Sequence, residues 1–578
     1  MLKFAISDGR SGTIERDCAI ELQAGDRIEF DLASGGHWFG HGFNHVQSYP
    51  LETGRITAET FAVNNIQSPI WMCSNGVALL ADTKRLLRVM LNENGDGKLR
   101  VTAANDGLCL KIWKRSTLPE AQQALLAYLG WPNQVPDENL LGDSLFCTWT
   151  QYPRCVTQER ILGMAREIHA RKYPCSKLII DDRWESCFGE LSFSKDFADP
   201  AAMIREIHQL GIGVWLWVTP FVNQEAAGFN ELAQQKILVP AKDGKGAALF
   251  KWWGGTAGLI DVTSPQGRNW LRGKLRTLMT KYGVDGFKID GGDFKYQPSP
   301  ETADWHEFLG ESGYSDALLA LFEELVPNAC ESRTAWLSQR RSILWRQGGK
   351  DSHWGEDNGL AAMVRLALQL SLLGYDLQIP DMIPGRVQTL MADFPLPTDE
   401  LMIRWTEATA FMPFMQYSYF PWNYAPETEQ VLHAYALLHK CLQAYLAGQA
   451  KDRSAPLLRP VWYDAPQVPE LFAIADEFLL GADLLAAPVL QGGAVTRDVL
   501  LPPGDWRDAW TGQPLTGGWQ RNYPAPCPGL PLFVRAERAE LAKLLRENLS
   551  LIVRGGMDPL KTSTNYSAGL NRDISVTG

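Results

Sequence analysis

The chain has 578 residues, a formal net charge of −11 and 21% charged residues. A chain of this length usually forms more than one hydrophobic core, so we expect two to four domains. The acidic balance and the lack of a basic run exclude a nucleic-acid partner, because a negative field repels a polyanion. The ten Cys and nine His form neither a Cys-x-x-Cys pair nor a His-Glu-x-x-His motif, so we expect no metal and no other cofactor.

The sequence gives no signal for a membrane. Its first ten residues, MLKFAISDGR, lack the apolar stretch of a secretory signal. Nowhere do about 18 apolar residues run unbroken, which is the length that a spanning helix needs. We therefore expect a soluble cytoplasmic protein with reduced thiols and no membrane partner. Whether the chain forms a homo-oligomer is left open.

Residues 1–117 consist of short alternating apolar runs separated by Gly, Asn and Asp, as in Arg27–Leu32 and Gly76–Ala81. This spacing predicts an N-terminal β-sandwich. Residues 118–143 follow as a helical linker, in which a helix over Leu118–Leu129 leads into a segment with two prolines. Strand-like and helix-like runs then begin to alternate.

Residues 144–450 predict a catalytic (β/α)8 TIM barrel, a fold of the α/β class, because eight candidate strands alternate with amphipathic helices. The predicted strands are Leu145–Trp149, Leu178–Asp182, Val214–Thr219, Gly286–Asp290, Cys330–Arg333, His353–Gly355, Gln378–Asp381 and Phe414–Tyr417. An insertion near residues 223–262 is too long for a plain connection, and such segments usually build or cover a site. Residues 451–538 predict a C-terminal β-sandwich, and residues 539–578 form a tail without a clear period.

Charged and aromatic residues close nearly all the predicted barrel strands, where the active site of such a barrel lies. These candidates are Trp149, Asp181, Asp182, Trp184, Trp217, Lys288, Asp290, Arg333, Trp354, Asp357 and Asp381, with Trp253 added from the insertion. Asp290 and Asp357 stand 67 residues apart, each before a Gly-rich or helix-like run. Two such carboxylates suggest cleavage of a glycosidic bond, in which one is ionised and the other gives a proton.

Other interpretations of the same residues stay open. Asp181 or Asp182 is also typical of a residue that caps a turn. Lys288 lies two residues before Asp290 on one strand face, which predicts an ion pair that keeps Asp290 ionised or a plain structural pair. The carboxylates of Asp181, Asp290 and Asp381 also suit Mg²⁺, so a metal-dependent barrel enzyme is an alternative.

Several segments together resemble glycoside hydrolase family 31, and within it the group of the myogenesis-regulating glycosidase, over residues 144–534. They are Thr148-Trp149, Val156–Glu159, Ile180–Trp184, Leu216–Asn223, Trp252-Trp253, Asp285–Asp290, Asp351–Gly355, Ser371–Tyr375 and Ile379–Met382. The resemblance implies a retaining, exo-acting α-glycosidase with Asp290 as nucleophile and Asp357 as general acid/base. It also implies that the other candidates bind the non-reducing sugar of a small-molecule or oligosaccharide α-glycoside.

Departures from the family pattern bear on the identity of the sugar. Many α-glucosidases of the family carry Arg and His after the last barrel strand, where this chain has Gln416 and Ser418. The family's usual Glu after the nucleophile is here Asp293. Because the group it resembles is associated with α-galactosides, we expect an α-galactosidase. An α-glucosidase, an α-xylosidase, a transglycosylase and a non-catalytic sugar-binding protein remain alternatives.

Overall fold

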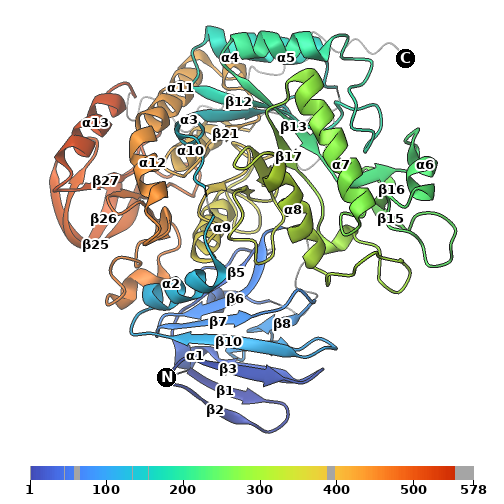
Figure 1. Cartoon of the computed structure of the whole chain (residues 1–578). Coiled ribbons are helices and arrows are strands. Elements are labelled where there is room, and N and C mark those ends of the chain that lie inside the picture. The colour runs from blue at the N-terminus through green and yellow to red at the C-terminus, as the bar shows by residue number, and fades with distance from the viewer. Residues whose placement is uncertain are drawn as a thin grey trace.

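The computed structural model describes residues 2–44, 46–56, 65–132, 134–153, 155–386 and 397–552. Figure 1 shows two N-terminal sheets (blue) below a barrel of parallel strands, and a third antiparallel sheet (orange to red) at the side of the barrel. The predicted α/β class, with a TIM barrel between two β domains, is therefore confirmed.

The N-terminal part packs two five-stranded antiparallel sheets against each other. Their strand orders are β2-β1-β4-β9-β8 and β3-β10-β7-β6-β5. The elements are β1 (Leu2–Ile6), β2 (Ser11–Ile14), β3 (Cys18–Leu22), β4 (Arg27–Asp31), α1 (Leu32–Gly35), β5 (Trp38–Gly42), η1 (Leu51–Thr53), β6 (Gln67–Cys73), β7 (Val77–Ala81), β8 (Arg88–Leu91), β9 (Lys98–Thr102) and β10 (Leu108–Lys114). Alternate side chains such as Ile28, Phe30, Leu79 and Leu110 point inward and form the core, as the sequence pattern predicts.

Two helices lead from this sandwich to the barrel. Helix α2 (Leu118–Leu129) begins at Thr117, which exchanges hydrogen bonds with Glu120 in a capping box. These bonds satisfy N–H groups that have no partner within the helix, so the start of α2 is fixed by sequence. Helix α3 (Glu138–Gly142) follows and ends directly before the first barrel strand.

Eight parallel strands form the barrel sheet, in the order β20-β19-β18-β17-β13-β12-β11-β21. They are β11 (Ser144–Cys147), β12 (Cys175–Ile180), β13 (Gly213–Val218), β17 (Gly286–Ile289), β18 (Cys330–Ser332), β19 (Leu344–Arg346), β20 (Gln378–Ile379) and β21 (Gln416–Tyr417). A parallel bridge between Ile383 and Tyr417 brings the two edges together. The carboxyl ends of all eight strands therefore face one side, where the site is expected.

The sixth barrel strand lies elsewhere than the sequence predicts. The structure forms it as β19, whereas the predicted strand His353–Gly355 is a series of bends in the following loop. Strand β19 has three residues, and Arg346 within it is buried and forms ion pairs with Glu331 and Asp381. The apolar run before Arg346, Ile343–Trp345, is too short to show a strand period, which explains the error.

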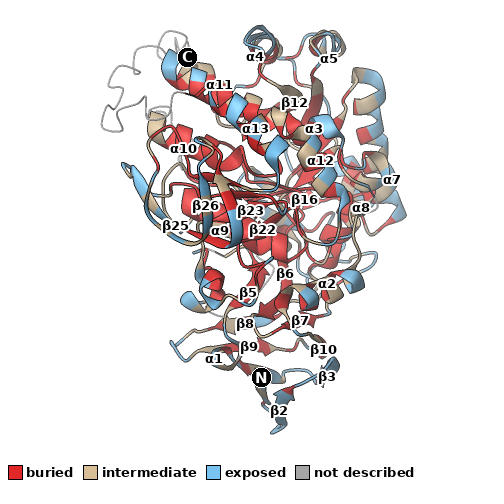
Figure 2. Ribbon diagram, turned by 90° about the vertical axis from the view of Figure 1, so that its left-hand side faces the viewer, coloured by how far each residue is buried: buried red, intermediate tan, exposed pale blue. Residues whose placement is uncertain are grey.

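Helices surround the barrel and expose different amounts of surface. They are α4 (Gln158–Ala170), α5 (Pro200–Gln209), α7 (Pro265–Thr277) with a π-helical turn η2 (Leu278–Tyr282), α8 (Gly313–Leu325), α9 (Leu360–Leu372), α10 (Asp399–Thr409), η4 (Pro421–Asn423), α11 (Pro426–Cys441) and α12 (Gln443–Lys451). Helix α9 is buried along nearly its whole length, while α7 buries only a stripe through Leu271 and Leu275 (Figure 2). Helix α9 is covered because it packs against β5 of the sandwich and β22 of the C-terminal sheet.

The insertion after β13 folds into a small sheet of its own. Its elements are β14 (Phe221–Asn223), α6 (Phe229–Gln234), β15 (Leu249–Trp252) and β16 (Gly255–Leu259), and a short turn η3 (Phe294–Tyr296) follows β17. The side chain of Asn223 accepts a hydrogen bond from the Trp252 indole at 2.9 Å and donates one to the Gly254 carbonyl at 2.8 Å. These bonds fix the turn that carries Trp253.

The C-terminal part is a six-stranded antiparallel sheet in the order β22-β23-β24-β27-β25-β26. Its elements are β22 (Leu458–Pro460), η5 (Pro469–Ala473), β23 (Phe478–Leu480), β24 (Leu484–Ala486), β25 (Thr496–Asp508), β26 (Pro514–Pro524), β27 (Leu532–Arg535) and α13 (Ala539–Leu549). Helix α13 lies where the sequence predicts an aperiodic tail, and it buries Ala542, Leu545 and Leu549. Three apolar positions at helical spacing were too few to be recognised beforehand.

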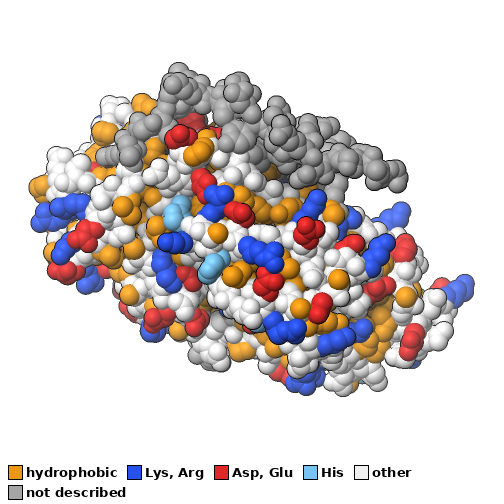
Figure 3. All heavy atoms as spheres, turned by 90° about the horizontal axis from the view of Figure 1, so that it is seen from above, with side chains coloured by type: hydrophobic (Ala, Val, Ile, Leu, Met, Phe, Trp, Pro, Cys, Tyr) orange, Lys and Arg blue, Asp and Glu red, His pale blue; other side chains and the backbone are white. Residues whose placement is uncertain are grey.

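The surface carries charges of both signs. On the face seen in Figure 3, Lys and Arg side chains are interspersed with Asp and Glu. In the part of the chain that the structure describes, no helix has the length and apolar character needed to cross a membrane.

Candidate active site

Asp290 follows the fourth barrel strand, β17, and its carboxylate accepts hydrogen bonds from three neighbours. The indole Nε1 of Trp217 on β13 donates to Oδ2 at 3.0 Å. The backbone N–H of Gly291 donates to Oδ1 at 2.9 Å, and the guanidinium Nε of Arg333, after β18, donates to the same oxygen. The Asp290 side chain remains 18% exposed. The carboxylate is therefore held in one orientation and is still accessible to a ligand.

Arg333, and not Lys288, keeps Asp290 ionised. Burial would raise the pKa of the Asp290 carboxyl, but the charges of Arg333 and Arg346 and the Trp217 hydrogen bond bring this pKa well below its usual range. The ion pair predicted between Lys288 and Asp290 is wrong. Lys288 points instead toward the carboxylate of Asp181, which follows β12, two strands away in the sheet, and lies 2.8 Å from its Nζ.

Lys288 is buried inside the barrel between two carboxylates. Its Nζ lies 2.8 Å from Oδ2 of Asp181, after β12, and 3.8 Å from Oε1 of Glu331 on β18. Burial would lower the pKa of Lys288, but the charge of Asp181 raises it above its usual value. Burial raises the pKa of Glu331, against the opposing effect of Lys288 and Arg346. Lys288 therefore stays charged and fixes the orientation of Asp181.

Asp182 and Trp184 are both buried but differ in what their side chains can do. Burial, together with the adjacent charge of Asp181, raises the pKa of Asp182 to about 8. Its Oδ2 has no hydrogen-bond partner among the residues that the structure describes and lies 3.8 Å from Nε of Arg183, so burial favours the protonated form of this carboxyl. Trp184 is 0% exposed and donates to the backbone carbonyl of Trp217 at 2.7 Å. Trp184 therefore supports Trp217 from behind, and the prediction that it contacts the sugar does not fit this position.

Asp381 lies two residues after the seventh strand, β20, in a backbone conformation that is uncommon for residues other than glycine. Its φ is 71°, in the left-handed region, and its side chain is fully buried. Its Oδ2 accepts the backbone N–H of Lys350 at 2.7 Å, and its Oδ1 lies 3.4 Å from Nη1 of Arg346. Such strain persists only where the surroundings enforce it, and it is common at functional sites. Asp381 therefore fixes the loop that begins after β19.

Four aromatic side chains gather next to Asp290. The ring of Trp253, at the turn between β15 and β16, lies 6.2 Å from Trp149, 6.3 Å from Trp217 and 5.5 Å from Phe188 between ring centroids. Trp253 is 47% exposed. Because Trp217 also donates to Asp290, this aromatic group borders the carboxylate and offers apolar faces to a sugar ring.

Asp357 lies in the loop between β19 and α9 and differs sharply from Asp290 in its surroundings. Its side chain is 65% exposed, and its Oδ1 lies 3.8 Å from Nδ1 of His353. Trp354 of the same loop is half-buried against Gly492, where an added Cβ would come within 3.0 Å of the indole Nε1. The loop, and not the side chain's own contacts, therefore decides where the Asp357 carboxyl points.

The structure brings most of the predicted residues into one connected network around Asp290, while Trp184 supports it from outside and Asp357 stands on an exposed loop. Sequence reasoning missed Arg346 and Glu331. Glu331 on β18 lies two residues before Arg333, which directly follows that strand, and this spacing signals a shared face. Arg346 was hidden by the misplaced sixth strand.

The alternative of a metal centre is disfavoured by the charges in this network. Each of the three carboxylates considered as ligands, Asp181, Asp290 and Asp381, is instead paired with Lys288, Arg333 or Arg346. Within the described ranges, no group of three or more His, Cys, Asp or Glu is placed to hold a metal ion.

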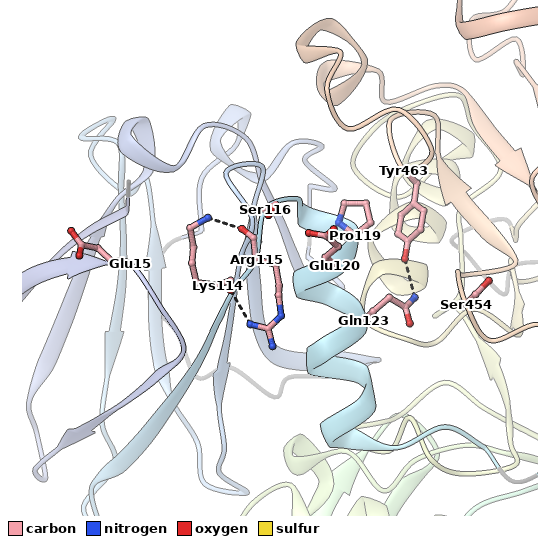
Figure 4. Close-up of a pocket in the computed structure, with 9 residues that line it drawn as sticks. All are labelled: Glu15, Lys114, Arg115, Ser116, Pro119, Glu120, Gln123, Ser454 and Tyr463. Atoms are coloured by element: carbon pink, nitrogen blue, oxygen red, sulfur yellow. Dashed lines mark hydrogen bonds between the residues drawn. The ribbon is translucent and has the colours of Figure 1, made fainter.

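A separate cleft of about 930 Å³ lies between the N-terminal sandwich, α2 and the start of the C-terminal sheet (Figure 4). Several of its polar groups are already engaged. Arg115 pairs with Asp17, Glu120 caps its own helix, and Gln123 donates to Tyr463 at 3.0 Å. None of the residues singled out from the sequence lines this cleft, so the barrel end remains the candidate site.

Comparison with known families agrees with this architecture. A model described as the glycosyl hydrolases family 31 TIM-barrel domain matches residues 138–448, and a model of that family's C-terminal domain matches residues 454–539. A model of the myogenesis-regulating glycosidase N-terminal domain matches residues 20–109.

Individual relatives support the same grouping. The myogenesis-regulating glycosidase of Mus musculus is 31% identical over 524 residues, which cover 85% of this chain and 73% of that protein. A 1,3-alpha-isomaltosidase of Kribbella flavida is 31% identical over 390 residues, which cover 60% of this chain and 52% of that protein. The solved structure of a sulfoquinovosidase from E. rectale, in complex with an aza-sugar inhibitor, shares the fold with a TM-score of 0.79 at 19% identity, over 93% of this chain and 87% of that chain.

Proposed function

Because the chain belongs to glycoside hydrolase family 31, we propose that it is a retaining, exo-acting α-glycosidase with Asp290 as nucleophile and Asp357 as general acid/base. The observation that carries this proposal is the contrast between the two carboxyl groups. Asp290 is oriented and kept ionised by Arg333 and Trp217, as a nucleophile must be. Asp357 is exposed on a loop, where it can reach a leaving group and water.

The reaction proceeds in two steps on this arrangement. In the first step an Asp290 oxygen forms a bond to the anomeric carbon, the bond to the aglycone oxygen breaks, and Asp357 gives that oxygen its proton. In the second step Asp357 takes a proton from water, the water oxygen bonds to the anomeric carbon, and Asp290 leaves as a carboxylate. Two inversions at the same carbon return the α configuration.

For the sugar, we propose galactose. The positions at which many α-glucosidases of the family carry Arg and His are here Gln416 and Ser418. Gln416 donates to Glu331 at 3.0 Å, and the Ser418 hydroxyl accepts the backbone N–H of Thr150 at 2.8 Å. Both side chains are thus directed to protein groups, and neither supplies the charge that Arg provides. The absence of this Arg charge favours a sugar whose hydroxyls differ from those of glucose. The axial O4 of galactose is such a difference.

The test is hydrolysis of 4-nitrophenyl α-galactoside, α-glucoside and α-xyloside by the wild type, Asp290→Ala and Asp357→Ala, with the anomer of the released sugar followed by NMR. We expect the galactoside to be the best substrate, with retention, and both variants to lose at least about 10²-fold in kcat/KM. Asp304→Ala, an exposed aspartate in the loop after β17, is the matched control and should keep wild-type rates.

Each other outcome has a distinct meaning. Faster cleavage of the glucoside or xyloside rejects galactose and keeps the mechanism. A β product in the first minutes rejects retention. Release of 4-nitrophenol without an equal amount of free sugar, at high acceptor concentration, identifies a transglycosylase. Binding of a sugar without turnover of any α-glycoside identifies a non-catalytic sugar-binding protein and rejects the proposal.

A further inference from the structure

Lys350 lies in the loop between β19 and α9, seven residues before Asp357, and is 1% exposed. A buried lysine is costly, because its ammonium loses contact with water. Burial lowers the pKa of Lys350 to about 8, although the charges of Asp381 and Asp351 oppose this effect and those of Arg386 and Arg346 add to it. The reaction proposed above gives Lys350 no task, so its position calls for another explanation.

Three anchors hold Lys350 in place. Its backbone N–H donates to Oδ2 of the strained Asp381 at 2.7 Å, and its carbonyl accepts the backbone N–H of Arg386 at 2.8 Å. Its Nζ donates to Oδ1 of Asn358 at 3.4 Å and lies 5.8 Å from the ring centroid of Phe43. Lys350 thus joins the seventh strand end, the N-terminal sandwich and the residue next to Asp357.

Asn358 is the link between Lys350 and the general acid/base. While its Oδ1 accepts from Lys350, its Nδ2 donates to the Gly349 carbonyl and to Oδ2 of Asp351, both at 2.9 Å. The Asn358 side chain is therefore fixed at both ends. The neighbouring Asp357 has few contacts of its own and is 65% exposed, so its direction follows the backbone that Asn358 fixes.

The N-terminal sandwich holds the same loop from the other side. The backbone N–H of Gln47 donates to the Glu356 carbonyl at 3.0 Å, and Arg365 on α9 binds Oε1 of Glu356 at 2.7 Å. Arg365 also donates to the Gln47 carbonyl at 3.4 Å. The residues on either side of Asp357 are thus anchored by different parts of the fold.

On this geometry, and resting on the proposed function, we propose that Lys350 is a positioning residue that orients the Asp357 carboxyl through Asn358. Lys350 touches neither the reacting atoms nor Asp357 itself. Its removal should therefore harm the proton transfer to the leaving group more than the attack by Asp290. A residue that only stabilises the fold would affect the proton transfer and the attack alike.

Leaving groups of different acidity separate these two effects. The kcat/KM of the wild type, Lys350→Met and Asn358→Ala would be measured for α-galactosyl fluoride, whose departure needs no proton, and for methyl α-galactoside, whose departure does. Because general acid catalysis contributes about 10²–10⁴-fold, we expect both variants to lose about 10–100-fold on the methyl glycoside and less than about 3-fold on the fluoride. Asp357→Ala should show the same split more strongly.

Lys295→Met serves as the matched control, because Lys295 is an exposed lysine in the turn η3 after β17, and it should change neither rate. Equal losses on both substrates, or no loss on either, would overturn the positioning role.

Hydrogen exchange of the peptide spanning residues 352–359 provides a readout independent of activity. This exchange should be faster in Lys350→Met than in the wild type and unchanged in Lys295→Met. Unchanged exchange in Lys350→Met overturns the inference even if no glycoside is cleaved. A wild type that cleaves neither galactoside rejects galactose as the sugar and leaves the exchange test of Lys350 unaffected.

Discussion

Replacement of Arg333 by Met tests directly how the nucleophile is kept ionised. The side chain of Arg333 binds Asp290 through Nε and Asp293 through Nη2, the latter at 3.1 Å. Methionine retains the apolar stem of the side chain and removes the charged guanidinium. Protonated Asp290 cannot attack, so activity is lost as the pH falls through its folded pKa, and a raised pKa moves this loss to higher pH.

The size of the shift follows from the contact. Two unit charges about 4 Å apart interact by about 4 kcal/mol at an effective dielectric constant near 20, which corresponds to about 3 pKa units. Arg346 and the Trp217 hydrogen bond remain in the variant, and the Asp290 side chain is 18% exposed. We therefore expect the pKa of Asp290 to rise by about 1–3 units.

The assay is kcat/KM against pH, from about pH 3 to 8, on the best aryl glycoside, because this quantity reports the pKa values of the free enzyme. The acid limb should lie below the usual carboxyl range in the wild type and move upward in Arg333→Met. Since this variant leaves buried Asp293 without its cation, Arg333→Met with Asp293→Asn is the companion variant. A uniform loss of rate at all pH values, with an unmoved acid limb, would refute the reasoning.

Three further changes have expected outcomes. Burial raises the pKa of Glu185 to about 8. The contribution of Glu185 to stability is therefore present below its unfolded pKa and is lost as the pH rises toward 8. In thermal unfolding, Glu185→Gln should leave Tm unchanged at pH 5 and should raise the unfolding free energy at pH 8.5 by on the order of 1–3 kcal/mol. Lys288→Met leaves Asp181 and Glu331 buried without their shared cation, and chemical denaturation should show a loss of about 3–5 kcal/mol; an unchanged unfolding free energy would contradict the ion pair. Trp253→Ala removes a 47% exposed ring and should raise KM about 2–10-fold with Tm unchanged; equal KM values would mean that no sugar stacks there.

The sequence was sufficient to predict most of the architecture because most strands and helices show a hydrophobic period of their own. The alternation in residues 1–117 predicts the two N-terminal sheets, and apolar runs before Asp181, Trp217 and Asp290 predict β12, β13 and β17 to within a few residues. Strand β19 escaped because its apolar run, Ile343–Trp345, is too short to show a period and ends at the charged Arg346. Helix α13 escaped because its apolar side is short.

The sequence by itself determined which chemical groups reach the site, because the carboxyl ends of all strands in a parallel barrel lie at one rim. It therefore placed Asp290, Asp181, Arg333 and the tryptophans in one candidate site. Only the tertiary structure decided how these groups pair. Lys288 lies near Asp290 in the sequence, and Arg333 lies near it across the sheet. Which of these two cations binds Asp290 depends on where their side chains point, and differences of a few ångströms decide this. The same holds for Lys350, whose Nζ lies 5.8 Å from the ring centroid of Phe43, more than 300 positions away in the chain.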